Sequence, residues 1–111
     1  MSTARDMLAA ARKRIAAPGC WAQHAFAKDP TGLVVCSTDA IATSYCMLGA
    51  LLAGCNPKVF ETWTAEAESH LVTEIRKTSS YGSISGYNDA KTRTHADVLN
   101  TYDAAINACS T

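Results

Sequence analysis

The sequence has no net charge, no paired cysteine spacing and no apolar run long enough to cross a membrane. Each absence excludes some classes of function. Ten Lys and Arg residues balance ten Asp and Glu residues, so no overall field attracts nucleic acid or an anionic membrane. We therefore expect neither as a partner. Because a protein near zero charge associates readily, a homodimer remains one alternative.

The cysteines are odd in number and irregularly spaced, which does not fit a disulfide framework. The first 17 residues lack the continuous apolar region of a secretory signal. Both observations indicate free thiols and a cytoplasmic location. Without a C-x-x-C or H-x-x-x-H pair or a glycine-rich phosphate loop, we expect no metal and no cofactor. The five cysteines are Cys20, Cys36, Cys46, Cys55 and Cys109.

The longest uncharged stretch, residues 40–57, predicts a buried central helix over about residues 38–54. A helix that is apolar on nearly every face must be covered on several sides. Thr43 and Ser44 shorten its apolar part too much for a membrane span. One stripe of this helix carries only small side chains, and we expect the segment from Asn88 to His95 and the last helix to lie near it. The stripe consists of Ala42, Cys46, Gly49 and Ala53.

The remaining patterns predict a mainly α single domain over residues 1–111, with a minor β component. Helices are expected over residues 3–17 and 58–77 and after Thr94, with Thr3–Asp6 and Thr94–Asp97 resembling capping boxes. A break in the second helix near Thr64 is an alternative. A small β-hairpin is expected over about residues 21–36, because Asp29-Pro30-Thr31-Gly32 forms a turn in which proline fixes one dihedral angle and glycine permits a positive one. The Ser- and Gly-rich residues 78–89 predict a loop. In total, about four helices surround the central one.

Four residues have the types needed for a cysteine-dependent enzyme, namely Cys46, His95, Asn88 and Asp89. A cysteine nucleophile needs a lowered pKa or a neighbouring imidazole, and the imidazole needs an Asn or Asp to orient it. In the alternative interpretation, Cys46 is a small buried residue that permits close helix packing. His95 would then hold the Asn88–Asp89 loop against the last helix.

The residues expected to contact a partner lie before the hairpin and around the 78–89 loop. Trp21 is interpreted first as an apolar anchor between the hairpin and the helices. Arg93 lies close in sequence to Tyr87 and can touch an anion, but it does not form a basic patch. The full set is Trp21, Tyr87, Asn88, Asp89 and Arg93.

Several short motifs together resemble a family of small uncharacterised proteins of bacteria and their phages. The motifs are Trp21 with Phe26-Ala27-Lys28-Asp29, then Cys46-Met47-Leu48-Gly49-Ala50-Leu51, Tyr87-Asn88-Asp89 and Thr94-His95-Ala96-Asp97-Val98-Leu99. Tyr87 stands where such proteins usually have tryptophan, and Met47 stands where they have a small residue. The resemblance implies a shared fold and a phage or mobile-element origin, and it carries no assigned activity.

We therefore expect a small non-catalytic accessory protein that binds or inhibits a host protein. Its small size, its zero net charge and the lack of a convincing cofactor or catalytic signature favour this function. The alternative is a hydrolase or acyl transferase that uses Cys46 and His95. The accessibility of Cys46 and its distance from His95 distinguish these two functions, because a nucleophile must be accessible and a base must reach its proton.

Overall fold

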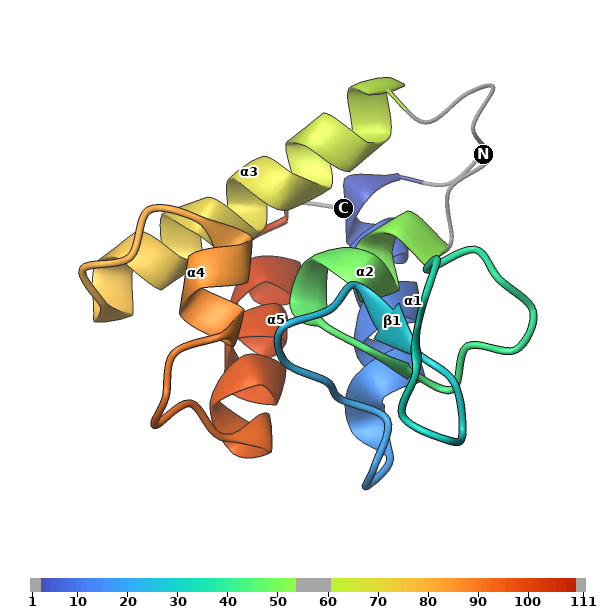
Figure 1. Cartoon of the computed structure of the whole chain (residues 1–111). Helices are drawn as coiled ribbons and strands as arrows, with labels where there is room; N and C mark the ends of the chain where they lie inside the picture. Colours follow the sequence, from blue (N-terminus) through green and yellow to red (C-terminus); the bar gives the residue numbers. More distant parts are fainter. Residues whose placement is uncertain (1–2, 54–60, 110–111) are drawn as a thin grey trace.

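The computed structural model describes residues 3–53 and 61–109, with side chains in the second range described from residue 65 onward. This part of the chain contains five helices and a small antiparallel sheet (Figure 1), which confirms the mainly α fold class with a minor β component. In chain order the elements are α1 (Ala4–Ala16), β1 (Ala27–Lys28), β2 (Val34–Val35), β3 (Ser44–Tyr45), α2 (Met47–Ala53), α3 (Glu61–Thr78), α4 (Ile84–Asn88) and α5 (His95–Ala108).

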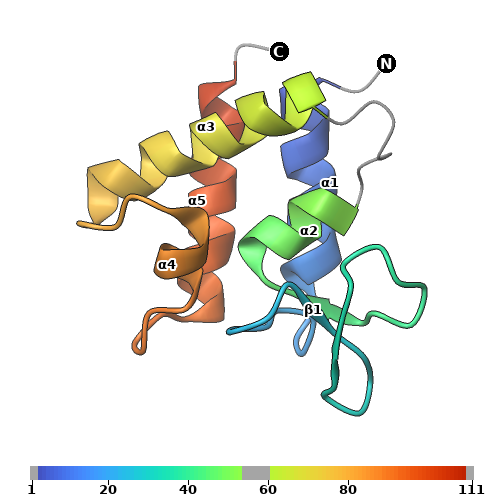
Figure 2. The same ribbon diagram turned by 45° about the horizontal axis from the view of Figure 1, so that its top comes forward.

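The longer helices begin where the sequence predicts. Thr3 and Asp6 form a reciprocal capping box at the start of α1, and Thr94 and Asp97 form another at the start of α5. α1 and α5 run side by side, and α3 crosses them (Figure 2). The helix predicted over residues 58–77 is α3, which continues without a break through Thr64, while its predicted first residues lie outside the described ranges.

The central helix is shorter than predicted. α2 begins at Met47, whereas the sequence predicted a helix from about residue 38. Thr43 donates its backbone N–H to the carbonyl of Lys28 at 2.9 Å, and Tyr45 donates to Cys20 at 2.9 Å. These backbone groups therefore pair with β1 and with the segment around Trp21, and not within a helix, as suits β-branched and aromatic residues. The prediction for residues 38–46 was wrong because an uninterrupted apolar run does not distinguish a buried strand from a buried helix.

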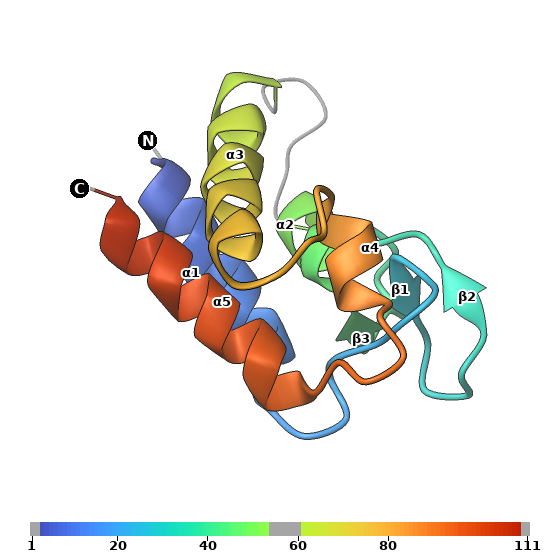
Figure 3. The same cartoon turned by 90° about the vertical axis from the view of Figure 1, so that its left-hand side faces the viewer.

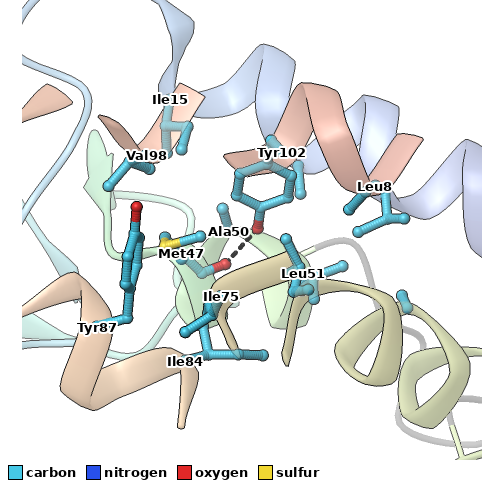
Figure 4. Packing of buried hydrophobic residues seen from close by; sticks show 14 of the residues in the cluster. Leu8, Ile15, Met47, Ala50, Leu51, Ile75, Ile84, Tyr87, Val98 and Tyr102 are labelled. Carbon is cyan, nitrogen blue, oxygen red and sulfur yellow. Dashed lines mark hydrogen bonds between the residues drawn. The ribbon is translucent and has the colours of Figure 1, made fainter. Parts of the chain in front are cut away.

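α2 nevertheless occupies the centre of the molecule (Figure 1). Met47, Ala50 and Leu51 are fully or almost fully buried, and the hydroxyl of Tyr102 on α5 donates a hydrogen bond to the carbonyl of Met47. Figure 4 shows this bond within the surrounding apolar cluster. Within the described residues, no helix combines the length and apolarity needed to span a membrane.

The sheet has the strand order β2–β1–β3, with β2 at its outer edge (Figure 3). Ala27 pairs with Val35 across the β-hairpin, which confirms the predicted hairpin, and Gly32 in its turn has a φ of +90°. The third strand, β3, was missed because its residues were assigned to the central helix. On its far side β3 is covered by Trp21, which bridges to Tyr45.

The segment predicted as a loop over residues 78–89 contains the short helix α4. The side chain of Ser83 caps it by accepting the N–H of Gly86 at 3.0 Å, and Ile84 and Tyr87 are buried on one face. Serine and glycine favoured a loop by composition, but the burial of these two larger side chains stabilises one turn of helix.

Candidate functional site

Asn88, the last residue of α4, joins three separate parts of the chain. Its side chain is fully buried, and its Oδ1 accepts hydrogen bonds from Nε1 of Trp21 at 2.7 Å and from the backbone N–H of Met47 at 3.0 Å. Its Nδ2 donates to the carbonyl of Ala22 at 3.1 Å and to Oδ1 of Asp89 at 2.9 Å. Two bonds to the oxygen and two from the nitrogen use the hydrogen-bonding capacity of the amide fully. Asn88 is therefore a structural hub.

The segment just after Trp21 is held to the end of α4 by further bonds. Nε2 of Gln23 donates to the carbonyls of Asn88 at 2.9 Å and Ala90 at 3.1 Å. The backbone N–H of His24 donates to Oδ1 of Asp89 at 2.8 Å. His24 has a φ of +65°, a left-handed conformation that is uncommon for a residue with a side chain. Asp89 thus fixes His24 in an uncommon backbone conformation beside α4.

His95, the first residue of α5, contacts Trp21 and the end of α1. Its ring stacks on the indole with a centroid separation of 5.8 Å and an interplanar angle of 9°. Nε2 of His95 lies at hydrogen-bond distance from the carbonyl of Ile15 at the end of α1. Because a carbonyl only accepts, Nε2 carries a proton in this arrangement. The predicted bond from His95 to the Asn88–Asp89 loop is replaced by one to α1.

Cys46 lies directly before α2 and is 4 % exposed. Its Sγ accepts the N–H of Gly49 at 3.2 Å, and its own N–H donates to the carbonyl of Phe26 at 3.2 Å. Burial raises the pKa of the Cys46 thiol; the bonds from Gly49 and Leu48 oppose this shift, and the Asp89 carboxylate adds to it. The thiol is therefore protonated and covered at neutral pH, which is unfavourable for a nucleophile.

The structure brings together only part of the predicted catalytic set. Asn88 and Asp89 are bonded to each other, and Trp21 links Asn88 to the ring of His95. Among the hydrogen bonds of residues 3–53 and 61–109, none joins Cys46 to His95. The His95 ring is instead held between Trp21 and the carbonyl of Ile15, and the Cys46 thiol is buried, so this geometry gives the enzyme interpretation no support.

Tyr87 and Arg93, two predicted binding residues, contact each other and pack against the fold. The guanidinium carbon of Arg93 lies 3.5 Å from the centre of the Tyr87 ring, and its Nε donates to the carbonyl of Tyr87 at 2.8 Å. The hydroxyl of Tyr87 is hydrogen-bonded to Thr101 at 2.9 Å. Both side chains fix the turn between α4 and α5, and little of either is exposed.

The stripe of small residues is approached closely at Gly49 by the residue just before β1. A Cβ on Gly49 would lie 1.8 Å from the carbonyl oxygen of Phe26, so only glycine permits the observed contact. The segment starting at Asn88 does reach α2, through the bond to Met47. We expected this segment to make the close approach to the stripe. The structure shows instead that Phe26, just before β1, makes it.

A cavity of about 340 Å³ lies on the side of the sheet that faces α4. The sequence singled out Cys46 and Asp89, and a pocket under the 78–89 loop was one weak alternative, but the other lining residues were not predicted because they come from separate stretches of the chain. No group of three or more metal-binding side chains occurs in the part of the chain that the structure describes. The lining residues are His24, Ala25, Phe26, Val34, Cys46, Ser85 and Asp89.

The fold and the Asn88 network define a small helical domain in which one buried amide links the segment before the sheet to α2 and α4. The chain belongs to a family of unknown function, DUF6197, whose family model matches residues 1–108. No curated protein and no solved structure matches the chain.

Proposed function

We propose that this chain is a non-catalytic accessory protein that binds another protein through the outer part of its sheet. The observation that carries the proposal is the exposure of four large apolar side chains between residues 26 and 41. We refer to the exposed parts of these four residues together as the hairpin surface: Phe26 at 50 %, Leu33 at 67 %, Val34 at 68 % and Ile41 at 53 % exposed. Tyr81 completes the set of exposed large apolar side chains among the described residues.

The edge of β2 supports the same function. Asp29 donates its N–H to the carbonyl of Leu33 at 2.9 Å, and bonds across an antiparallel pair alternate from one residue to the next. Val34 therefore directs its own backbone N–H and carbonyl away from β1. An outward N–H and carbonyl beside apolar side chains suit the addition of a strand from a partner.

The chemistry of the other candidate residues favours binding over catalysis. Cys46 is buried and protonated, and His95 and Asn88 are engaged in bonds that hold the fold together. Zero net charge favours a protein partner over nucleic acid. The resemblance to proteins of bacteria and their phages extends the proposal to a phage or mobile-element factor that binds or inhibits a host protein in the cytoplasm. A second copy of the chain is an alternative occupant of the same edge.

A matched pair of variants tests this function. Leu33→Asp places a charge on the hairpin surface, whereas Thr73→Asp places one on an exposed position of α3. Affinity capture from a bacterial host, followed by titration of the purified partner, measures both. We expect Leu33→Asp to weaken binding by about tenfold or more, equivalent to about 1.4 kcal/mol, and Thr73→Asp to leave it within about twofold. Equal binding by both variants, or a monomer that captures no protein, would contradict the proposal.

A further inference from the structure

The cavity beside α4 combines an apolar wall with one incompletely satisfied carboxylate. Ala25, Phe26 and Val34 provide apolar surface, and Ser85 and Asp89 provide polar groups from α4 and its cap. The volume of about 340 Å³ falls within the range of small-ligand sites, roughly 300–1,000 Å³. We refer to it as the Asp89 cavity.

The two oxygens of Asp89 differ in their partners. Oδ1 accepts hydrogen bonds from the N–H of His24 at 2.8 Å and from Nδ2 of Asn88 at 2.9 Å. Oδ2 lies 3.9 Å from Nδ1 of His24, which is beyond hydrogen-bond distance. No other described residue donates a hydrogen bond to Oδ2, and the Asp89 side chain is 34 % exposed. The carboxylate is therefore held rigidly with one oxygen available.

The charges around the cavity are unbalanced. No Lys or Arg occurs among the described residues that line it. Two arginines near α4 and α5 pair with other carboxylates and not with Asp89. Arg93 pairs with Asp97, and Arg12 pairs with Asp103. The Cys46 thiol is neutral because burial raises its pKa. His24, whose side chain is 73 % exposed, is the remaining titratable group among the lining residues.

We propose that the Asp89 cavity binds an organic cation, an ammonium or guanidinium group carried on an apolar stem. The cation would pair with Oδ2 of Asp89, and the stem would contact Phe26 and Val34. A cation near the Phe26 ring also gains cation–π attraction. A free amine and the Lys or Arg side chain of a bound protein share this chemistry.

Titration with small probes, followed by amide resonances of Ala25, Ser85 and Asp89, tests the proposal. The probes are n-butylammonium, 1-butanol as its neutral counterpart and butyrate as its anionic counterpart. We expect saturable shifts with n-butylammonium at millimolar concentration, and at least tenfold weaker effects with the other two. Equal effects of n-butylammonium and 1-butanol would overturn the proposal.

Two variants assign the effect to this cavity. Asp89→Asn retains one oxygen for His24 and Asn88 but removes the charge, so binding of n-butylammonium should weaken at least tenfold. Phe26→Ala removes an exposed wall residue and should weaken it severalfold even if Asp89→Asn fails to fold. Unchanged binding in a folded Asp89→Asn variant, or in Phe26→Ala, would overturn the assignment.

A second probe distinguishes the two sources of the cation. N-acetyl-lysine N-methylamide carries the same ammonium on a peptide-like backbone. Binding of both probes supports a protein side chain as ligand, and binding of n-butylammonium alone supports a free amine. Leu33→Asp serves as a control, because Leu33 does not line the cavity and its replacement should leave cation binding intact. Loss of protein binding and loss of cation binding are thereby separately observable.

Discussion

Nε1 of Trp21 donates a hydrogen bond of 2.7 Å to Oδ1 of Asn88, although the two residues lie 67 positions apart. The same oxygen accepts the N–H of Met47, the first residue of α2. One buried amide therefore fixes the segment before the sheet, the start of the central helix and the end of α4 relative to one another. Through Asp89, it also positions the cavity at which we infer that a cation binds.

Replacing Asn88 should lower the free energy of unfolding by more than the loss of one hydrogen bond would. Asn88→Ala leaves Nε1 of Trp21, the N–H of Met47 and the carbonyl of Ala22 without their partner. Each unsatisfied buried group costs about 1–3 kcal/mol, so we expect a loss of about 3 kcal/mol or more in the free energy of unfolding, measured with urea. Asn100→Ala, at an exposed position of α5, is the control and should change it by less than about 0.5 kcal/mol. A similar small change in both variants would refute the role of Asn88 as hub.

Gly49 should be intolerant of even a methyl group. The Cβ of Gly49→Ala would collide with the carbonyl oxygen of Phe26, so β1 and α2 must separate. We expect a loss toward the upper end of about 1–3 kcal/mol, despite the higher helix propensity of alanine. In the control Gly82→Ala, the nearest atom to the new Cβ is a side-chain nitrogen of Arg76 at 3.8 Å, an ordinary contact. Thermal unfolding measures both variants, and a Gly49→Ala protein as stable as Gly82→Ala would contradict the packing described.

Cys46 should react slowly with alkylating reagents in the folded protein. Since burial raises the pKa of its thiol, the thiolate fraction at neutral pH is lower than for an ordinary cysteine, and the covered sulfur is also inaccessible. Exposed Cys36 is the internal control. Mass spectrometry of protein treated with iodoacetamide should find Cys36 labelled at least tenfold faster. Preferential labelling of Cys46 near neutral pH would revive the cysteine-enzyme alternative.

The turn between β1 and β2 should depend on the ionisation of Asp29. The hydroxyl of Thr31 donates to Oδ1 of Asp29 at 2.6 Å, and the N–H groups of Thr31 and Leu33 add two further bonds. These bonds, led by that of the hydroxyl, lower the pKa of Asp29 below its ordinary value of 3.8. The stabilisation is therefore complete above that value and is lost as pH falls through the lowered pKa.

Carboxyl-carbon resonances followed during an acid titration measure this effect. We expect the Asp29 midpoint to lie below 3.8 and to rise toward it in Thr31→Ala, which removes the hydroxyl. The amide resonances of Thr31 and Leu33 should shift with the same midpoint. A midpoint that Thr31→Ala leaves unchanged would show that the hydroxyl does not lower the pKa.

Local chemistry made the ends of α1 and α5 and the hairpin turn predictable from sequence. Thr3, Thr94 and Gly32 act within three or four residues of the chain, and both capping boxes and the positive φ of Gly32 are present as expected. The start of α2 was not predictable in this way. Its position depends on pairing between Ser44–Tyr45 and a strand formed much earlier in the chain.

The candidate site was predictable only as a set of residue types. The sequence singled out Asn88, Asp89, Trp21 and His95, and the structure places these four close together. Tertiary packing, which no short motif specifies, decides which atoms the Asn88 amide bonds. It also decides that the carbonyl of Ile15 accepts the hydrogen bond from His95. The lining of the Asp89 cavity was not predictable for the same reason, since Val34 and Asp89 come to line one cavity only in the folded chain.

Site-specific photo-crosslinking tests the proposed function most directly. A benzoylphenylalanine at position 33 lies on the hairpin surface, and one at position 73 lies on the exposed side of α3. In host cells, we predict one discrete crosslinked protein, or a crosslinked dimer, from position 33 and none from position 73. Crosslinking from position 73 and not from position 33, or from neither, would contradict a function that depends on binding through the hairpin surface.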